Sequence, residues 1–130
     1  MISNAARVLL AIPFFLHVTP LAEYRCDVNM KVDPDGFWSE EQIEVGQWHI
    51  LIRDTGSAAT ISRCSFSPSQ QKITCDLYQV DRIEVDPAVK IKKYYYFRGQ
   101  FDVQVFPNLT FIANNGRGTI SYGTCRVIAP

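Results

Sequence analysis

The sequence predicts an all-β domain: a small antiparallel meander, closed as a barrel or packed as a two-layer sandwich, with about eight strands and two disulfides. Three observations support this fold class. Turn-forming residues recur about every 8 to 12 residues. β-branched and aromatic residues dominate the segments between these turns. The four cysteines, an even number, all follow an N-terminal apolar segment.

That apolar segment has the layout of a secretory signal peptide. Arg7 precedes an 11-residue apolar run over residues 8–18, and Ala22 offers the small side chain that a signal peptidase requires. A membrane-spanning helix needs about 20 apolar residues, so we expect no stable membrane insertion. The sequence predicts a signal peptide over residues 1–22, a single domain over residues 23–130, and a secreted or periplasmic product. The alternative is an N-terminal helix that stays in the core of the domain.

The charge of the predicted domain is close to neutral. The whole chain has 13 Lys and Arg against 13 Asp and Glu. Because Arg7 is the only one of these in residues 1–22, the domain carries 12 basic and 13 acidic side chains. A domain without a basic excess is not expected to bind phosphate backbones, and we predict no nucleic-acid partner.

The strands follow from the turn signals between them. The Pro-Asp-Gly sequence at residues 34–36 ends the first strand, and Asn-Gly at residues 115–116 favours a tight turn before the last one. Ser39 and Gln42 match a capping box, so a single helical turn competes with the start of the second strand. The other boundaries are residues 55–57, residues 67–71, Pro87 and residues 107–108. The expected strands are residues 24–32, 43–54, 59–66, 72–80 with an extension over 82–86, 91–98, 100–106, 109–113 and 119–128.

Residues 59–66 and 72–80 predict a disulfide-bonded hairpin. If the chain turns at residues 69–70, Cys64 faces Cys75. The same register places Arg63 opposite Asp76, so it satisfies a charged pair as well. This agreement favours a Cys64–Cys75 disulfide.

Cys26 and Cys125 then form the second disulfide, close to the two ends of the domain. Metal binding is the competing interpretation of four cysteines. No two are spaced as C-x-x-C, and His49 is the only histidine after residue 22. The sequence therefore predicts no metal site and no cofactor.

A run of basic and aromatic residues, residues 90–98, offers candidate binding side chains. This composition suits stacking on bases or sugars, and it also suits a strand. Alternation places Tyr95 and Phe97 on one face, which we expect to be core. Tyr94 and Tyr96 fall on the other face, which we expect to be exposed and available for binding.

A second candidate is the Gly-flanked loop over residues 114–118. It presents Asn115 and Arg117 on a short turn, and arginine is enriched at interface hot spots. The competing interpretation is a plain hairpin turn.

Residues 24–26 and 118–125 place a cysteine near each end of the domain, with the cysteine hairpin between them. In this layout the chain resembles small exported bacterial all-β proteins. Its architecture is also similar to that of small periplasmic inhibitors of lysozyme or proteases, which are compact calycin-like barrels. The resemblance supports the fold. Our first hypothesis is a monomeric binding module, of the inhibitor kind or acting within the cell envelope, that uses exposed loops such as residues 114–118 and whose partner is a protein or another envelope macromolecule.

Two other functions remain as alternatives. A calycin-like carrier would hold a small apolar ligand in a cavity. We predict no enzymatic activity, and a hydrolase that uses His49 or Asp102 is the remaining possibility. The residues expected to line a carrier cavity are Trp38, Trp48, Phe101 and Phe111.

Overall fold

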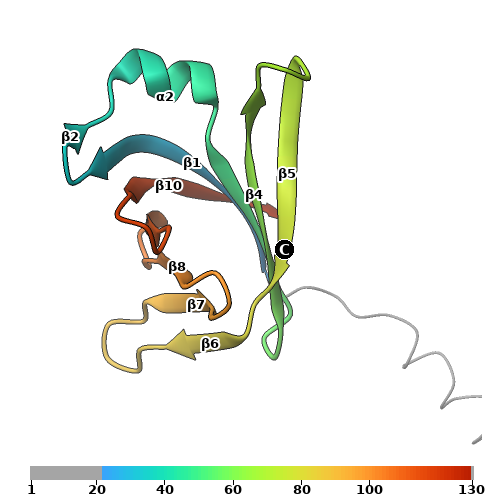
Figure 1. Ribbon diagram of the computed structural model, residues 1–130. Helices are drawn as coiled ribbons and strands as arrows, with labels where there is room; N and C mark the ends of the chain where they lie inside the picture. Colours follow the sequence, from blue (N-terminus) through green and yellow to red (C-terminus); the bar gives the residue numbers. More distant parts are fainter. Residues whose placement is uncertain (1–21, 130) are drawn as a thin grey trace, which may run out of the picture.

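The computed structural model describes residues 22–129, which form ten strands and one short helix (Figure 1). Ala22, the last residue of the predicted signal peptide, begins the first strand, and the rest of that segment lies outside the described residues. Within residues 22–129, no helix is long and apolar enough to cross a membrane. The elements are β1 (Ala22–Asp33), β2 (Gly36–Phe37), α2 (Glu40–Gly46), β3 (His49–Asp54), β4 (Ala59–Ser67), β5 (Lys72–Gln79), β6 (Arg82–Val85), β7 (Lys92–Tyr96), β8 (Phe101–Val105), β9 (Thr110–Asn114) and β10 (Ile120–Ala129).

All strands belong to one antiparallel sheet, in the order β5-β4-β3-β1-β10-β9-β8-β7-β6, and β2 pairs with the end of β1. The first and last long strands, β1 and β10, therefore lie side by side in the middle. Strands β3 to β5 form one arm of the sheet, and strands β6 to β9 form the other. Each arm is a meander, and the prediction of an antiparallel all-β fold is confirmed.

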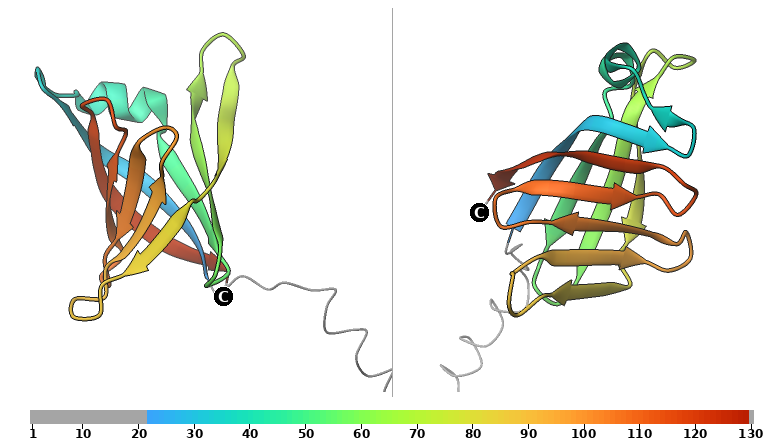
Figure 2. Two further views of the ribbon diagram at one scale, coloured as in Figure 1. Left: turned by 60° about the horizontal axis from the view of Figure 1, so that its bottom comes forward. Right: turned by 90° about the vertical axis from the view of Figure 1, so that its left-hand side faces the viewer.

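The sheet curls into a half-barrel whose two arms face each other (Figure 2). Its edge strands, β5 and β6, do not pair with each other within residues 22–129, which leaves an open seam. The chain crosses this seam at Val80 and Asp81, whose N–H groups donate to Ala59 O and Tyr95 O, each at 2.9 Å. Figure 2 shows the arms close together at one end and spread apart toward the end that carries α2.

The core fills the space between the arms. Tyr94 of β7 donates its hydroxyl hydrogen to Asp54 Oδ2 of β3 at 2.6 Å, so a buried hydrogen bond joins the two arms. Asp54 is 2% exposed, and a carboxylate at that depth requires such partners. The largest side chains with less than 2% exposure are Tyr94, Phe111, Ile52, Ile61, Val103 and Cys26.

Strand β7 alternates as the sequence predicts, but with the two faces reversed. Tyr94 is fully buried and Phe97 is 58% exposed. The prediction of Tyr94 on an exposed binding face, with Phe97 in the core, is therefore wrong. Alternation determines which residues share a face, whereas partners on other strands decide which face is buried. Here Asp54 provides the buried partner for the Tyr94 hydroxyl.

Helix α2 replaces the first part of the predicted strand over residues 43–54. The capping box is confirmed: Gln42 N–H donates to Ser39 Oγ at 3.1 Å, and Ser39 N–H donates to Gln42 Oε1 at 2.8 Å. The helix ends at Gly46 and is capped by Gln47, whose φ of 48° is left-handed. Only then does β3 begin, at His49, so the predicted strand starts too early.

Both predicted disulfides are present, Cys26–Cys125 and Cys64–Cys75. Each joins directly opposite positions on neighbouring strands, β1 with β10 and β4 with β5. The hairpin register is confirmed as well, because Arg63 lies opposite Asp76.

Candidate functional site: a pocket at the open seam

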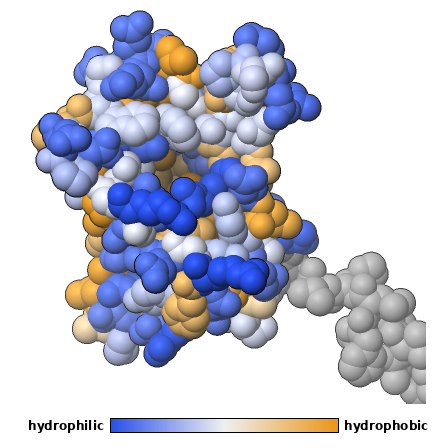
Figure 3. Space-filling view, in the orientation of Figure 1, coloured by the Kyte–Doolittle hydropathy of each residue, from blue (hydrophilic) through white to orange (hydrophobic). Residues whose placement is uncertain are grey.

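A pocket of about 200 Å³ opens between the arms where they spread apart. Its walls come from β1, β3 and the β4–β5 hairpin on one side, and from the ends of β8, β9 and β10 on the other. Figure 3 shows this face of the molecule with a recess bordered by strongly hydrophilic side chains. The charged and titratable side chains that line the pocket include Lys31, His49, Arg63, Asp76 and Asp102.

A β-bulge in β1 turns Lys31 into the pocket. The pairing of β1 with β10 shifts between Val28 and Met30, so Asn29 is an extra residue in the strand. One extra residue inverts the alternation that follows it. Lys31 is consequently 9% exposed, while Met30 is 41% exposed.

Two indole rings hold the Lys31 ammonium group. Its Nζ lies 3.7 Å from the centroid of the Trp48 ring and 4.3 Å from that of Trp38. Asp33, two residues further along β1, accepts hydrogen bonds from Trp38 Nε1 at 2.8 Å and from Thr119 Oγ1 at 2.6 Å. Within residues 22–129, Lys31 forms no ion pair. Cation–π contact therefore replaces a salt bridge at this position.

Arg63 of β4 is held in the same way. Its Cζ lies 4.7 Å from the centroid of the Phe101 ring and 5.9 Å from that of Tyr78. The opposite residue on β5, Asp76, forms no ion pair with it. The pocket thus contains two cations that rest on aromatic rings.

These two cations act on each other electrostatically. Burial, and to a smaller extent the positive charge of Arg63, lower the pKa of the Lys31 ammonium from 10.5 to about 8. The carboxylate of Asp33 has the opposite, smaller effect. The repulsion between Lys31 and Arg63 in the folded protein is therefore only partly offset by the carboxylate of Asp33.

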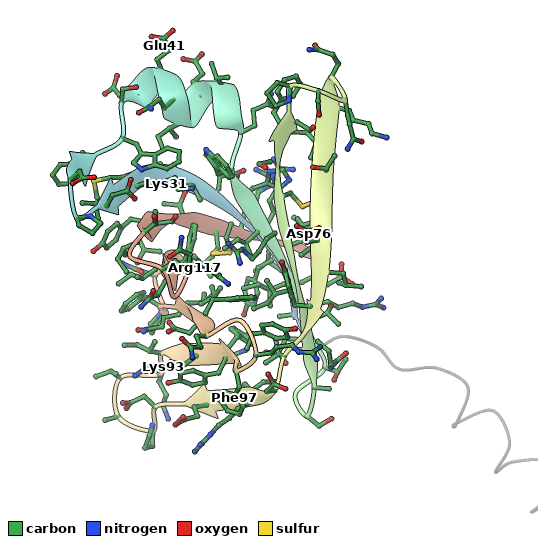
Figure 4. All side chains as sticks on the ribbon, in the orientation of Figure 1. Lys31, Glu41, Asp76, Lys93, Phe97 and Arg117 are labelled. Atoms are coloured by element: carbon green, nitrogen blue, oxygen red, sulfur yellow. A yellow bond between two sulfur atoms is a disulfide. The ribbon has the colours of Figure 1, made fainter. Side chains whose placement is uncertain are left out.

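The predicted binding loop lies beside this pocket. Asn115 lines the pocket, and its Oδ1 accepts hydrogen bonds from the N–H groups of Arg117 at 2.7 Å and Thr119 at 3.0 Å. These bonds fix the loop shape and leave the Arg117 side chain exposed. Figure 4 shows Lys31, Arg117 and Asp76 around the space between the two arms.

Of the tyrosines proposed for binding, Tyr94 is in the core and Tyr96 helps to close the seam. Tyr96 is half-buried, and its ring lies 5.0 Å, centroid to centroid, from both Tyr78 of β5 and Phe101 of β8. These three rings form an aromatic contact across the seam, which we call the seam cluster. It forms part of the pocket wall through Tyr78 and Phe101.

The residues considered for hydrolysis, His49 and Asp102, both line the pocket. The His49 Nδ1 lies 2.7 Å from Gln47 O, and Asp102 Oδ1 accepts a hydrogen bond from Gln104 at 3.5 Å. Within the described chain, no hydrogen bond joins either residue to a serine or threonine hydroxyl.

His49 also forms a cluster with a disulfide. The possible ligand atoms of His49, Cys64 and Cys75 lie within 4.8 Å of one another. Both sulfur atoms are bonded in the disulfide, so neither is the thiolate that a metal ion requires.

The four residues proposed for an apolar carrier do not line a common cavity. Trp38 and Trp48 pack edge to face, 5.9 Å apart, and line an open groove of about 460 Å³ beside α2. Trp48 also lines the seam pocket, as does Phe101, whereas Phe111 is 1% exposed in the core.

Sequence reasoning missed the two central cations of the pocket, Lys31 and Arg63. The signal for Arg63 was present, because the predicted hairpin register places it on the same face as Ile61, which is fully buried. Lys31 had no such signal, because its orientation depends on the bulge at Asn29.

No protein-family model matches the chain, and neither the curated proteins nor the solved structures include a significant match.

Proposed function

We propose that this chain is an exported binding module that engages a protein or another envelope macromolecule through the seam pocket and the β9–β10 loop. One observation carries this proposal: the pocket holds two cations, Lys31 and Arg63, that have no ion-pair partner among the described residues, and the loop that presents the exposed Arg117 lines the same pocket through Asn115. Arginine side chains next to aromatic rings are typical of interface hot spots. Two disulfides support export, since they persist in oxidising compartments.

Binding accounts for this pocket better than hydrolysis does. A hydrolase that forms a covalent intermediate needs its nucleophile within hydrogen-bonding reach of a base. His49 and Asp102 face the pocket, but their hydrogen bonds go to Gln47 and Gln104. A site that only binds a partner through Lys31 and Arg63 needs no pairing of a nucleophile with a base.

Site-specific photocrosslinking in the native host tests the proposal. A photoreactive amino acid replaces Arg117 in one variant and Ile128 in a matched control, since Ile128 is also exposed and lies at the far end of β10. We expect a discrete covalent adduct from position 117 and none from position 128. Equal labelling at both positions, or no adduct at either, would contradict the proposal.

A carrier of a small apolar ligand is the second candidate, and the groove beside α2 favours it. Trp38, Val45, Trp48 and Phe66 supply apolar walls to this groove, which is about 460 Å³ in volume. The ligand would lie outside the half-barrel, against the helix.

Native mass spectrometry of the unreduced exported protein tests the carrier function. A carrier predicts a small-molecule mass that accompanies the protein and is lost when Val45 is replaced by Glu. A bare monomer whose mass begins at Glu23, less four hydrogens for two disulfides, would reject the carrier and confirm the predicted cleavage site.

A further inference from the structure

The two cations of the seam pocket are available to an anion. Aromatic rings, rather than carboxylates, hold Lys31 and Arg63 in position. Asp33, the carboxylate nearest to Lys31 in the strand, already accepts hydrogen bonds from Trp38 and Thr119. An anion entering the pocket would therefore meet two positive charges without having to break an existing salt bridge.

The guanidinium group of Arg63 suits a planar, bidentate ligand. A guanidinium group that rests its face on a ring keeps its N–H groups in the guanidinium plane, directed away from the ring. The Arg63 Cζ lies over the Phe101 ring, 4.7 Å from its centroid. Its free N–H groups match the two oxygens of a carboxylate, and the Lys31 ammonium adds a second, less directional donor.

The charges on the pocket wall favour a singly charged ligand. Asp76 and Asp102 line the pocket together with the two cations. A doubly charged anion such as phosphate would meet stronger repulsion from these carboxylates than a singly charged one would. The rings of Tyr78 and Phe101 and the side chain of Val103 add apolar wall, which suits a short hydrocarbon stem.

We propose that the seam pocket binds a carboxylate group on a short apolar stem, with Arg63 as the bidentate donor and Lys31 as the second cation. This inference rests on the proposed function and names what the module recognises. The carboxylate belongs to an acidic side chain of the partner protein or to a free small acid, and both share the same chemistry.

Titration of the unreduced protein with butyrate, followed by NMR, is the direct experiment. Butyramide serves as the neutral isostere and inorganic phosphate as the more highly charged anion. We expect butyrate to bind with a Kd on the order of 1 mM, as befits a ligand of six heavy atoms. The signals of Trp48 and Phe101 should move as the pocket fills, while the two comparison compounds should bind at least about tenfold more weakly.

Variants assign the interaction to the pocket. Arg63→Gln should weaken butyrate binding at least about tenfold, because a charge-assisted hydrogen bond is lost. Arg63→Lys keeps the positive charge but loses the planar set of guanidinium donors, so its affinity for butyrate should lie between those of the wild type and Arg63→Gln. Lys72→Gln removes an exposed positive charge from the same hairpin and is the matched control, with an expected change of less than about twofold. Thermal unfolding of each variant verifies that it folds.

Three results would overturn the inference: butyramide binds as tightly as butyrate, phosphate binds more tightly than butyrate, or Arg63→Gln leaves the affinity unchanged. Glutamate blocked at both ends distinguishes the two sources of the carboxylate. Binding of the blocked glutamate supports an acidic side chain, whereas butyrate binding alone indicates a free small acid. If position 117 still forms its crosslink while butyrate does not bind, the binding module stands and only the carboxylate assignment fails.

Discussion

One extra residue in β1 determines that the Lys31 side chain points into the pocket. Without the bulge at Asn29, alternation would bury Met30 and leave Lys31 in solvent. With it, the ammonium group lies between two indole rings and close to a second cation, and its pKa falls to about 8. The folded protein accepts this charge at a cost in stability.

That cost predicts a pH dependence of folding. Because the folded pKa of Lys31 is about 8 and the unfolded value is 10.5, the unfolded chain binds more protons between these two pH values. The full penalty is present below pH 8 and is relieved as the pH rises toward 10.5. Between pH 7 and pH 10, the free energy of unfolding of the wild type should rise by about 1–3 kcal/mol relative to that of Lys31→Met.

Urea denaturation of both proteins at several pH values measures this difference. At each pH, subtracting the free energy of unfolding of Lys31→Met from that of the wild type removes, to first order, the contribution of the other titrating groups. The charged and titratable side chains near Lys31 are Asp33, His49, Arg63, Asp76 and Asp102. A wild-type curve parallel to that of the variant would show that the Lys31 ammonium is not destabilised in the folded protein.

At the scale of single elements, local signals in the sequence predict most of the fold. The hairpin of β4 and β5 has two cysteines and an oppositely charged pair in one register, and the structure has that register. The capping box at Ser39 marks the start of α2 because the side chain and backbone satisfy each other within three residues. What local signals could not predict is which face of β7 is buried, or where β1 bulges. Both depend on partners that are distant in the sequence, Asp54 for Tyr94 and Gly123 for Val28.

Gly123 of β10 lies opposite Val28, next to the bulge in β1, and its contacts give a second prediction. A Cβ at this position would lie 1.9 Å from Asp27 O and 2.7 Å from Phe111 Cε1, so β1 and β10 approach more closely than an alanine allows. Gly123→Ala should lower the free energy of unfolding by about 3 kcal/mol, the upper end for overpacking. Thr124→Ala, at the exposed neighbouring position of the same strand, should change it by less than about 1 kcal/mol. Similar losses in both variants would contradict the close approach.

At the scale of the whole molecule, the topology makes the central strand pair the junction of the two arms. Among residues 22–129, β5 and β6 do not pair across the seam; the chain at Val80 and Asp81, the seam cluster and the bond between Tyr94 and Asp54 connect the two arms there. The pairing of β1 with β10 is therefore the place where the strand ladder runs from one arm to the other, and the Cys26–Cys125 disulfide links the same two strands. Apart from the predicted pairing of Cys26 with Cys125, no local pattern in the sequence indicates that β1 and β10 lie side by side in the sheet.

The two disulfides should consequently differ in their effects when removed. Cys26–Cys125 links residues 99 positions apart, and Cys64–Cys75 links residues 11 positions apart. Loop-closure entropy gives losses of about 5 and about 3 kcal/mol, respectively. Replacing Cys26 and Cys125 by alanine also opens space in the core, since Cys26 is completely buried, whereas Cys75 is exposed. The first double variant should thus unfold at much lower urea concentration than the second.

Amide hydrogen exchange separates a global effect from a local one. Loss of Cys64–Cys75 should raise exchange in β4 and β5 and leave β8 to β10 protected, because this hairpin is the outer edge of one arm. Loss of Cys26–Cys125 should raise exchange in both arms, since the strands that join them are no longer tied. If instead both variants lose protection throughout the sheet to the same extent, the two arms fold as one cooperative unit, and the central strand pair has no special role in holding them together.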